Sequence, residues 1–261
     1  MNSKRQMNLH HIALGAVSFS GSTILSYVLG SLPGSRSAGE SHWLIDESSG
    51  GKLLGCCQCG QECRVLTDSF REALRRDQTG WYERIGQQLG ADILISSDKT
   101  PRLLDRFDPK RGFDLIIVFK EPRMQFGSYK KAMDRRSNPY NPEGYLKSWV
   151  DFYKGISQYE ICGQKIFLDS ESFQQAPADI VCKLCGALDL RFDESCLNYW
   201  EADHHTVGGN FNPYSRLKSE PSRMAVTTQS DYPLTEEELH IISTNARASE
   251  LYARMKSLAI G

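Results

Sequence analysis

The strongest constraint on the fold of this chain is an alternation of short apolar runs with longer segments of helical periodicity. The apolar runs are bounded by turn residues and occupy residues 11–19, 91–97, 113–119 and 165–170. Continuous apolar runs of this length are typical of strands that are buried on both faces of a parallel sheet. Helical periodicity is found at 23–32, 69–90, 123–133, 141–160, 178–188 and 235–258. The alternation predicts a three-layer, P-loop-like α/β fold in which helices flank a central parallel sheet.

Length and charge limit the classes of function. A chain of 261 residues is long enough to bury one large core, and we expect a single domain over residues 1–261. Its 31 basic and 32 acidic residues give a formal net charge of −1, which argues against binding to nucleic acid or to an acidic membrane surface. The apolar stretch near the N-terminus is broken by serines and never reaches the roughly 20 residues that a membrane span needs. We expect a cytoplasmic protein, and the sequence does not indicate its oligomeric state.

The turns that follow the apolar runs are the expected place for a ligand. In doubly wound sheets, ligands bind outside the carboxyl ends of the strands. Three such turns stand out, at residues 20–23, 98–101 and 120–123. An irregular and basic segment, residues 206–223, is a candidate lid over this edge.

The first turn has the composition of an anion site. It reads Ser20-Gly21-Ser22-Thr23 and lies between an apolar run and a helical segment. Backbone N–H groups at a helix N-terminus, together with serine and threonine hydroxyls, suit a tetrahedral anion. The lysine of a Walker-type loop is absent. The alternative is a helix that is merely capped by Ser or Thr and binds nothing.

The other two turns each place a lysine at a strand end. Lys99 follows the second run, where the alternative is an ordinary solvated lysine. Lys120 follows the third run, Pro122 prevents the strand from continuing, and Ser128 falls on the next helix. Two anion sites at neighbouring strand ends suggest a nucleotide with phosphates at two separate positions rather than a triphosphate bound with magnesium.

These motifs resemble those of the sulfotransferases that use 3′-phosphoadenosine 5′-phosphosulfate (PAPS). The segment "SFSGSTILSYVLGSLPGSRSAGE" is similar to the family's 5′-phosphosulfate loop, and "FKEPRMQFGS" is similar to its 3′-phosphate motif. "DHHTVGGN" resembles a signature of bacterial members, and "YEICGQKIFLDSESF" with "ALDLRFD" resembles the segment that leads to it. The resemblance covers about residues 9–216, and its motifs occur in the family's order.

The resemblance implies a set of site residues. The 5′-phosphosulfate would be held by Ser20, Gly21, Ser22 and Thr23, and the 3′-phosphate by Lys120 and Ser128. Arg216 would belong to the loop that closes over the nucleotide.

The tyrosyl-protein-sulfotransferase-like branch of the family implies two catalytic residues. Glu40 corresponds to its general base, and Lys99 to the lysine that neutralises the leaving phosphate. The cosubstrate would be PAPS, the product 3′-phosphoadenosine 5′-phosphate (PAP), and the acceptor a hydroxyl or amine of a small molecule or saccharide, with no metal required.

Two positions depart from the family's pattern. The residue before Ser-Gly-Ser-Thr is usually Arg or Lys, and here it is Phe19. The 3′-phosphate motif usually has Arg and Asp where this chain has Lys120 and Glu121. Lysine keeps the positive charge but lacks the bidentate fork of arginine. With Phe19 at this position, the family's cation beside the transferring sulfuryl group is absent. Lys99 or another basic residue would then have to supply that positive charge.

Other side chains compete for the same roles. Glu40 has the alternative of a surface acid, with neighbouring His42 as the base instead. His204 and His205 either assist the acceptor or pack under the lid. Segments 41–90 and 134–160 are expected to wall the acceptor pocket, and their aromatic residues suit sugars or rings as well as a core. The basic run at residues 130–136 is expected to be a solvated helix face, with contact to an anionic ligand as the alternative.

The cysteines form two groups. Four of the eight lie in "CCQCGQEC", at positions 56, 57, 59 and 63, and two more in "CKLC", at positions 182 and 185. Reduced thiols are expected in a chain of this size. A Cys-rich loop with a CxxC pair suits zinc, but "DIVCKLCGALDL" has the pattern of an amphipathic helix in which small cysteines fill the core. The sequence leaves the role of the first group open.

Two other functions remain open on the sequence alone. One is a non-catalytic PAPS- or PAP-binding protein, which the loss of the cation at Phe19 favours. The other is a P-loop kinase-like enzyme, against which the missing GxxxxGK[ST] motif counts.

Overall fold

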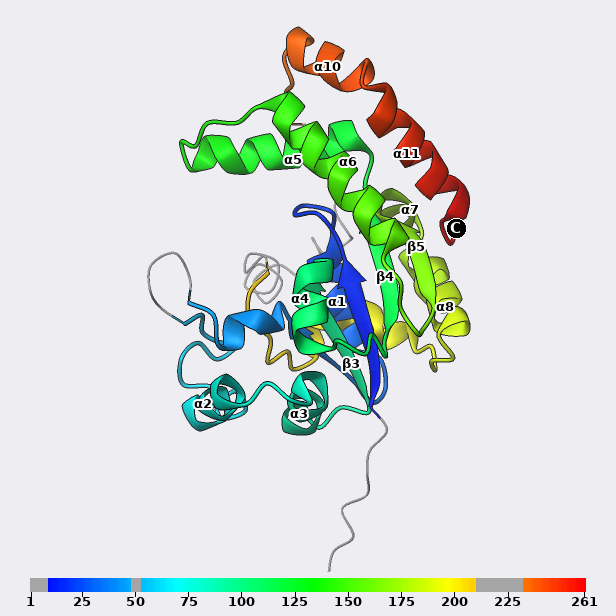
Figure 1. Ribbon diagram of the computed structural model, residues 1–261. Helices are drawn as coiled ribbons and strands as arrows, with labels where there is room; N and C mark the ends of the chain where they lie inside the picture. The colour runs from blue at the N-terminus through cyan, green and yellow to red at the C-terminus, as the bar shows by residue number, and fades with distance from the viewer. Residues whose placement is uncertain (1–8, 48–52, 210–231) are drawn as a thin grey trace, which may run out of the picture.

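A five-stranded, wholly parallel sheet lies at the centre of the computed structural model, which describes residues 9–47, 53–209 and 232–261 (Figure 1). The strand order is β2-β3-β1-β4-β5. The strands are β1 (His10–Gly15), β2 (Ser35–Gly39), β3 (Ile93–Lys99), β4 (Asp114–Phe119) and β5 (Lys165–Asp169). All four strand pairs are parallel, so the carboxyl ends of the five strands meet at one edge of the sheet.

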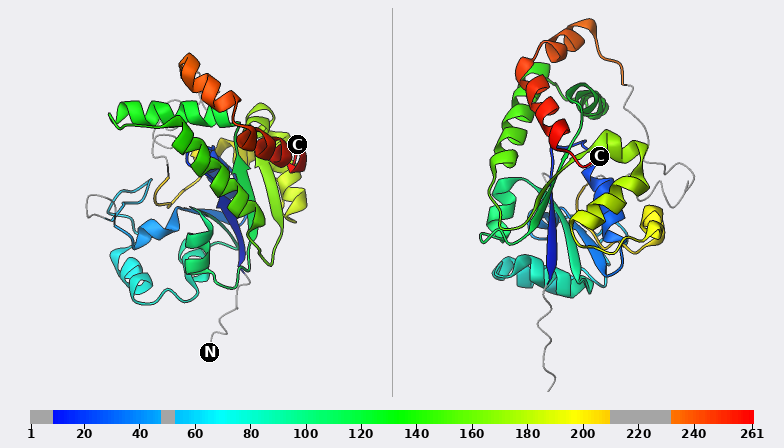
Figure 2. Two further views of the ribbon diagram at one scale, coloured as in Figure 1. Left: turned by 45° about the horizontal axis from the view of Figure 1, so that its top comes forward. Right: turned by 90° about the vertical axis from the view of Figure 1, so that its right-hand side faces the viewer.

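Helices cover both faces of the sheet, which confirms the predicted three-layer α/β architecture (Figure 2, right). One face is covered by α1 (Ser22–Gly30), α7 (Ser170–Gln175), α8 (Pro177–Ala187) and the 3-10 segment η2 (Glu194–Glu201). The other face is covered by α4 (Pro101–Phe107), α5 (Pro122–Arg135), α6 (Pro142–Gln158), α10 (Glu236–Ser243) and α11 (Ala246–Leu258). Beside β2 and β3 lie η1 (Ser41–Leu44), α2 (Asp68–Arg76) and α3 (Trp81–Leu89).

Two expected helices are each divided in the structure. The segment 69–90 forms α2 and α3, because Gly80 has a left-handed φ of 61° and precedes the first residue of α3. The prediction of one continuous helix over residues 235–258 is also wrong. This segment forms α10 and α11, which are separated at Asn245, and the side chain of Asn245 accepts a hydrogen bond from Ala248 N. A new N-cap of this kind starts a second helix in a different direction.

Strand β2 is an element that the sequence does not predict. Its residues are Ser-Arg-Ser-Ala-Gly, and the hydroxyls of Ser37 and Ser26 lie 2.6 Å apart across the contact with α1. The strand is held by pairing with β3 and by close packing of small residues, not by an apolar run. It matters for the site because Glu40 follows it directly.

No helix in the described part of the chain has both the length and the apolar character that crossing a membrane requires.

Candidate active site

Polar residues follow all five strands at the edge of the sheet where the carboxyl ends of the strands meet, here called the carboxyl-end edge. The register aligns Gly15 of β1 with Lys99 on one side and with Ile117 on the other, and it aligns Phe119 of β4 with Asp169 of β5. In the spatial order of the strands, Glu40, Lys99, Lys120 and Ser170 lie at or directly after the ends of β2, β3, β4 and β5, and the serine-rich turn (residues 20–23) follows β1 after residues 16–19. Residues from five separate parts of the sequence therefore lie along one edge.

The serine-rich turn has a backbone that only glycine fits at its centre. Gly21 adopts φ = 90°, in the left-handed region. A Cβ at this position would lie 2.8 Å from the hydroxyl oxygen of Ser170, closer than side chains approach one another. The absence of a side chain at Gly21 thus allows the turn to pack closely against Ser170 at the end of β5.

The turn presents donors for which the described part of the chain offers no acceptor. The residue before α1 is Gly21, and no side chain caps the helix, so the serine and threonine hydroxyls do not serve as its N-cap. The first N–H groups of a helix lack intrahelical acceptors. Among the described residues, no acceptor is found for the backbone N–H groups of residues 20–23. These groups point to a ligand that accepts several hydrogen bonds at once.

Three buried hydroxyls around the turn also lack partners. Within the described ranges, the side-chain oxygens of Ser20, Ser97 and Ser170 are buried and make no hydrogen bond. Leaving a buried hydroxyl unsatisfied costs free energy, typically ~1–3 kcal/mol. Three such groups from three strand ends are expected where a polar ligand binds, and an oxyanion with several acceptor oxygens suits them.

A hydrogen-bond network from α5 and α6 holds the chain just before the turn. Gln125 donates to the carbonyl oxygens of Val17 and Ser18 at 3.3 and 2.9 Å. Trp149 donates to Gln125 Oε1 at 2.9 Å, and Tyr153 donates to Val118 O at 2.9 Å while accepting from Val17 N at 3.4 Å. Trp149 and Tyr153 are fully buried, so of the two places that the sequence left open for them they take the core, where they support the turn. Trp81 and Tyr82 are likewise core residues.

Glu40 and Lys99 form an ion pair on the other side of the turn. Lys99 Nζ donates to Glu40 Oε1, and Trp43 Nε1 donates to Glu40 Oε2 at 3.0 Å. Burial opposes the ionisation of Glu40, but the charge and hydrogen bond of Lys99 together with the Trp43 bond outweigh it and lower its pKa. The side chains of Lys99 and Glu40 are 18% and 16% exposed, so Glu40 is a largely buried, ionised carboxylate and neither residue is a freely solvated surface charge.

His42, the alternative base, is held by a different acid. Asp98, which is fully buried, accepts from the Ser41 hydroxyl at 2.5 Å, from His42 N at 3.0 Å and from Tyr82 OH at 3.0 Å. Its Oδ1 also lies 2.9 Å from His42 Nδ1. This arrangement fixes the imidazole beside the site but directs one of its nitrogens into the protein.

A narrow pocket lies between the turn and Glu40. Its walls come from α1, from the ends of β2 and β3, and from residues 206–209; they include Thr23, Ser97, Glu40, Thr206 and Gly208. The chain at 206–209 joins the sheet edge, because Glu40 N donates to Val207 O at 2.9 Å. Gly208 has φ = 68°, and a Cβ there would lie 2.8 Å from Glu40 Cβ. Residues 206–209 therefore form a wall over Glu40, whereas the rest of the expected lid, 210–223, lies outside the described residues.

Lys120 is the cation on the β5 side of the turn. It is only 5% exposed, and no carboxylate of the described residues lies within ion-pair distance of its ammonium group. Burial lowers its pKa, while the charges of Glu171, Glu121 and Asp169 partly oppose that effect. Asp169 is already paired with Lys256 of α11.

Ser128 lies in α5, which begins two residues after Lys120. Its hydroxyl bonds to the carbonyl of Met124 at 3.2 Å within the helix. The hydroxyl is half-buried and can also accept or donate to a ligand, since one hydroxyl offers a donor and two acceptor sites. Arg216, the last of the expected nucleotide-binding residues, lies outside the described residues.

An open groove of about 580 Å³ borders the turn on the α5–α6 side. Phe19 lines it together with Tyr129, Tyr140 and Tyr145. The Phe19 and Tyr129 rings are 6.4 Å apart in an edge-on arrangement, and Phe19 has a left-handed φ of 70°. Phe19 thus places an aromatic wall where the resemblance expects a cation. Tyr140 and Tyr145 belong to segment 134–160, which the sequence analysis expected to wall an acceptor pocket.

The remaining residues singled out from the sequence have different places. His204 is buried against Tyr27, and burial lowers its pKa to about 4, whereas His205 lies beside the cysteines of residues 56–63. Lys130 is not on a solvated face: it is buried and paired with Glu238 of α10 at 2.8 Å. Lys131, Arg135 and Arg136 of that run are exposed.

Sequence reasoning missed Ser97, Ser170 and Gln125. The signal for the first two was their place at strand ends, the same rule that marked Lys99 and Lys120. Gln125 had no signal, because its role depends on the packing of α5 against the turn.

Replacing Ser20 separates ligand binding from stability. We expect Ser20→Ala to leave the unfolding midpoint unchanged or raise it, because the hydroxyl it removes is buried without a protein partner. The same change should weaken PAP binding about tenfold, the equivalent of one hydrogen bond of ~1.4 kcal/mol. Calorimetric titration and thermal unfolding of the same samples measure both effects. A loss of stability with unchanged affinity would contradict this assignment.

Comparison with known proteins agrees with this architecture. No protein-family model matches the chain, and no curated protein matches its sequence. Among solved structures, the sulfotransferase domain from the Synechococcus PCC 7002 olefin synthase superposes with a TM-score of 0.57 at 18% identity, covering 94% of this chain and 98% of that domain. The sulfotransferase domain from the curacin biosynthetic pathway gives 0.54 at 17% identity, covering 90% and 96%.

A third structure, mouse sulfotransferase SULT7A1 complexed with PAP, gives a TM-score of 0.42 at 10% identity, covering 98% of this chain and 77% of the mouse chain. The first two comparisons confirm, for the fold, the resemblance to sulfotransferases that the sequence motifs indicated.

Proposed function

We propose that this protein is a PAPS-dependent sulfotransferase that transfers a sulfuryl group to a hydroxyl or amine of a small molecule or saccharide. The observation that carries the proposal is the convergence at one sheet edge of the serine-rich turn, the Glu40–Lys99 pair and Lys120. The turn offers N–H groups and hydroxyls that have no partner among the described residues and suit a phosphosulfate, and Lys120 offers a separate cation for a second phosphate. The sulfotransferase fold supports this reading of the edge.

Different residues of the chain bind the two anionic ends of the nucleotide. Ser20, Gly21, Ser22 and Thr23 bind the 5′-phosphosulfate through backbone N–H groups and hydroxyls, with the positive end of α1 adding to the attraction. Lys120 and Ser128 bind the 3′-phosphate, and Arg216 is proposed to close over the nucleotide.

Glu40 and Lys99 perform the transfer chemistry. Glu40 accepts the proton of the acceptor hydroxyl or amine as the new bond to sulfur forms. Lys99 neutralises the 5′-phosphate as its bond to sulfur breaks, so that PAP leaves with the electron pair of that bond. Catalysis of this kind consists mainly of positioning and charge stabilisation, as in phosphoryl transfer. The ion pair keeps both residues at the site before substrates bind.

The groove lined by Phe19 and three tyrosines is the proposed acceptor site. Phe19 directly precedes the turn and lines the groove, whereas Thr23 ends the turn and lines the pocket that contains Glu40. The turn therefore borders both cavities, and an acceptor that occupies the groove must extend past the turn so that its reacting hydroxyl or amine reaches Glu40 as well as the sulfur. The aromatic lining suits the apolar face of a ring or a sugar.

The second candidate is a non-catalytic protein that binds PAPS or PAP. The specific observation in its favour is Phe19, because the aromatic ring leaves the turn without the adjacent cation. Thermal unfolding with PAP, with ATP and magnesium, and with buffer separates the candidates. Stabilisation by PAP together with release of PAP from PAPS across an acceptor panel supports the transferase. Stabilisation without any release supports the binder, and stabilisation by ATP alone contradicts both.

Lys120 provides the sharpest test of nucleotide choice. We expect Lys120→Met to weaken PAP binding by about 10- to 100-fold, since a hydrogen bond to a charged group is worth ~1.5–3 kcal/mol. Adenosine 5′-phosphate lacks the 3′-phosphate, so its affinity should change less than about threefold. Parallel titrations of the two nucleotides measure the difference. An equal loss for both would show that Lys120 does not bind the 3′-phosphate.

A further inference from the structure

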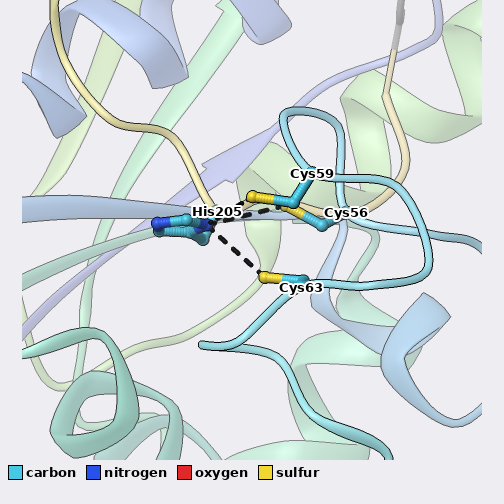
Figure 3. A group of neighbouring side chains, drawn as sticks. All are labelled: Cys56, Cys59, Cys63 and His205. Atoms are coloured by element: carbon cyan, nitrogen blue, oxygen red, sulfur yellow. Dashed lines mark hydrogen bonds between the residues drawn. The ribbon is translucent and has the colours of Figure 1, made fainter.

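A cluster of three cysteines and one histidine lies outside the proposed chemistry. It consists of Cys56, Cys59, Cys63 and His205, and their potential ligand atoms all lie within 4.8 Å of one another (Figure 3). The cysteines come from a loop between η1 and α2, and the histidine comes from the segment that ends at the active-site wall. About 140 residues of sequence separate the two, so the fold alone brings them together.

The distances match those of a tetrahedral metal site. His205 Nδ1 lies 3.8, 3.5 and 3.5 Å from the sulfurs of Cys56, Cys59 and Cys63. With Zn–S near 2.3 Å and Zn–N near 2.0–2.1 Å, a regular tetrahedron places nitrogen ~3.6 Å from each sulfur. One nitrogen close to three sulfurs at these separations suits a single ion at the centre.

The loop holds its cysteines in the manner of a metal-binding turn. Cys56 and Gly60 exchange backbone hydrogen bonds of 2.8 and 2.9 Å, which fold the Cys-x-x-Cys-Gly segment into a tight hairpin. The backbone N–H of Leu66 donates to the Cys63 sulfur at 3.3 Å. Bonds of this kind orient thiolate ligands and stabilise their charge.

A buried arginine supplies the charge balance. Arg71 is 3% exposed and donates to the carbonyls of Leu54 and Leu66, on either side of the cysteines. In the described part of the chain, no carboxylate lies within ion-pair distance of its guanidinium group. Three thiolates around a divalent cation carry one net negative charge, which would compensate this buried cation.

We propose that Cys56, Cys59, Cys63 and His205 bind one structural Zn²⁺ ion. A tetrahedral set of three thiolates and one imidazole favours zinc over harder divalent cations. The protein fills all four positions, which is typical of a structural site rather than of one that binds and activates a water. On binding, the cysteines lose their protons to solvent and the sulfurs become the ligands.

The site ties the loop to the wall over Glu40. Cys57 N donates to Thr206 O at 2.8 Å, and Gln58 accepts from His204 N at 2.7 Å, so the residues on either side of His205 are bonded to the loop. Residues 206–208 then continue directly into the wall of the narrow pocket. Metal binding would therefore hold this wall in place without taking part in the transfer.

The "CKLC" pair has no part in the site. Cys185 is buried in the core beneath α8, and Cys182 is exposed on the outer side of the same helix. This is the core-filling alternative that the helical pattern of this segment offered. It also makes Cys182 a suitable control.

Metal analysis of the full chain tests the proposal. Protein purified under reducing conditions from zinc-supplemented cells should contain one Zn²⁺ per chain by elemental mass spectrometry. Cys59→Ser and His205→Ala should each lower that content at least about fivefold, while Cys57→Ala, in the same loop, and Cys182→Ser should retain it. Wild-type protein that neither contains zinc nor binds added Zn²⁺ would overturn the proposal. Unchanged zinc in both ligand variants, or a disulfide between two of the three cysteines in the reduced preparation, would overturn it as well.

Two measurements on the wild-type chain avoid any dependence on the folding of variants. Co²⁺ exchanged into the protein should give the absorption of a tetrahedral ion with thiolate ligands, and the spectrum of a six-coordinate ion would contradict the site. Removal of the metal with a chelator should lower the unfolding midpoint by at least about 5 °C, because a ligand that binds only the folded state stabilises it. No change in the midpoint after verified removal of the metal would contradict a structural role.

Discussion

Glu40→Gln is expected to lower the turnover number by about 10²–10⁴-fold, the range typical of removing a general base. Glutamine keeps the shape of the side chain and can still accept from Trp43, so the local structure should remain. PAP affinity should change by no more than a few-fold, because Glu40 lies beyond the turn that is proposed to bind the nucleotide. Single-turnover kinetics with labelled PAPS and calorimetric titration with PAP measure the two effects.

The pH dependence of the reaction gives an independent check on Glu40. Lys99 and Trp43 lower the pKa of this carboxyl, so its ionised form is kept as pH falls into the usual carboxyl range. The acidic limb of the rate profile should therefore lie below that range, and it should disappear in Glu40→Gln. His42→Gln serves as the matched variant for the neighbouring alternative base. A larger loss in His42→Gln than in Glu40→Gln would assign the base to His42.

Lys99→Ala is expected to lower the turnover number by about 10²–10³-fold, since loss of one preorganised donor typically costs ~3–4 kcal/mol of barrier. The change also leaves Glu40 without its ion-pair partner, so the pKa of the Glu40 carboxyl should rise toward or above its ordinary value. Because Phe19 places no cation beside the turn, Lys99 carries this charge alone among the residues proposed for the transfer. Pre-steady-state kinetics measure the loss in the chemical step.

The double variant separates a shared role from two independent roles. If Glu40 and Lys99 act on the same transition state and position each other, Glu40→Gln with Lys99→Ala should lose less activity than the product of the two single losses. Arg102, an exposed cation three residues beyond Lys99, offers a control through Arg102→Ala, which should retain activity. Near-wild-type rates in both single variants would remove the pair from the mechanism.

The sequence predicts the sheet edge well because its signals are local. Strands β3 and β4, each marked by an apolar run, end at Lys99 and directly before Lys120, and the rule that ligands bind at carboxyl ends needs no knowledge of packing. Strand β2 has no such run, because it is built from serines that pack closely against α1. Because β2 was not predicted, the assignment of Glu40 as the general base depended on the family resemblance alone.

The parts of the site that the sequence could not supply depend on contacts between distant segments. Nothing local shows that Gln125 holds the chain before the turn, or that Trp149 and Tyr153 are buried behind it. His205 likewise has no spacing that relates it to the cysteines, which lie about 140 residues earlier. The aromatic residues were ambiguous for a physical reason: a ring has the same sequence pattern in a core and in a binding groove.

A crystal structure of the protein with PAP is the most direct test of the proposed nucleotide site. We predict the 5′-phosphate on the backbone N–H groups of residues 20–23, with the hydroxyls of Ser20 and Ser170 now bonded. We predict the 3′-phosphate at Lys120 and Ser128. Nucleotide bound away from the carboxyl-end edge, or a 3′-phosphate with no contact to Lys120, would contradict this assignment.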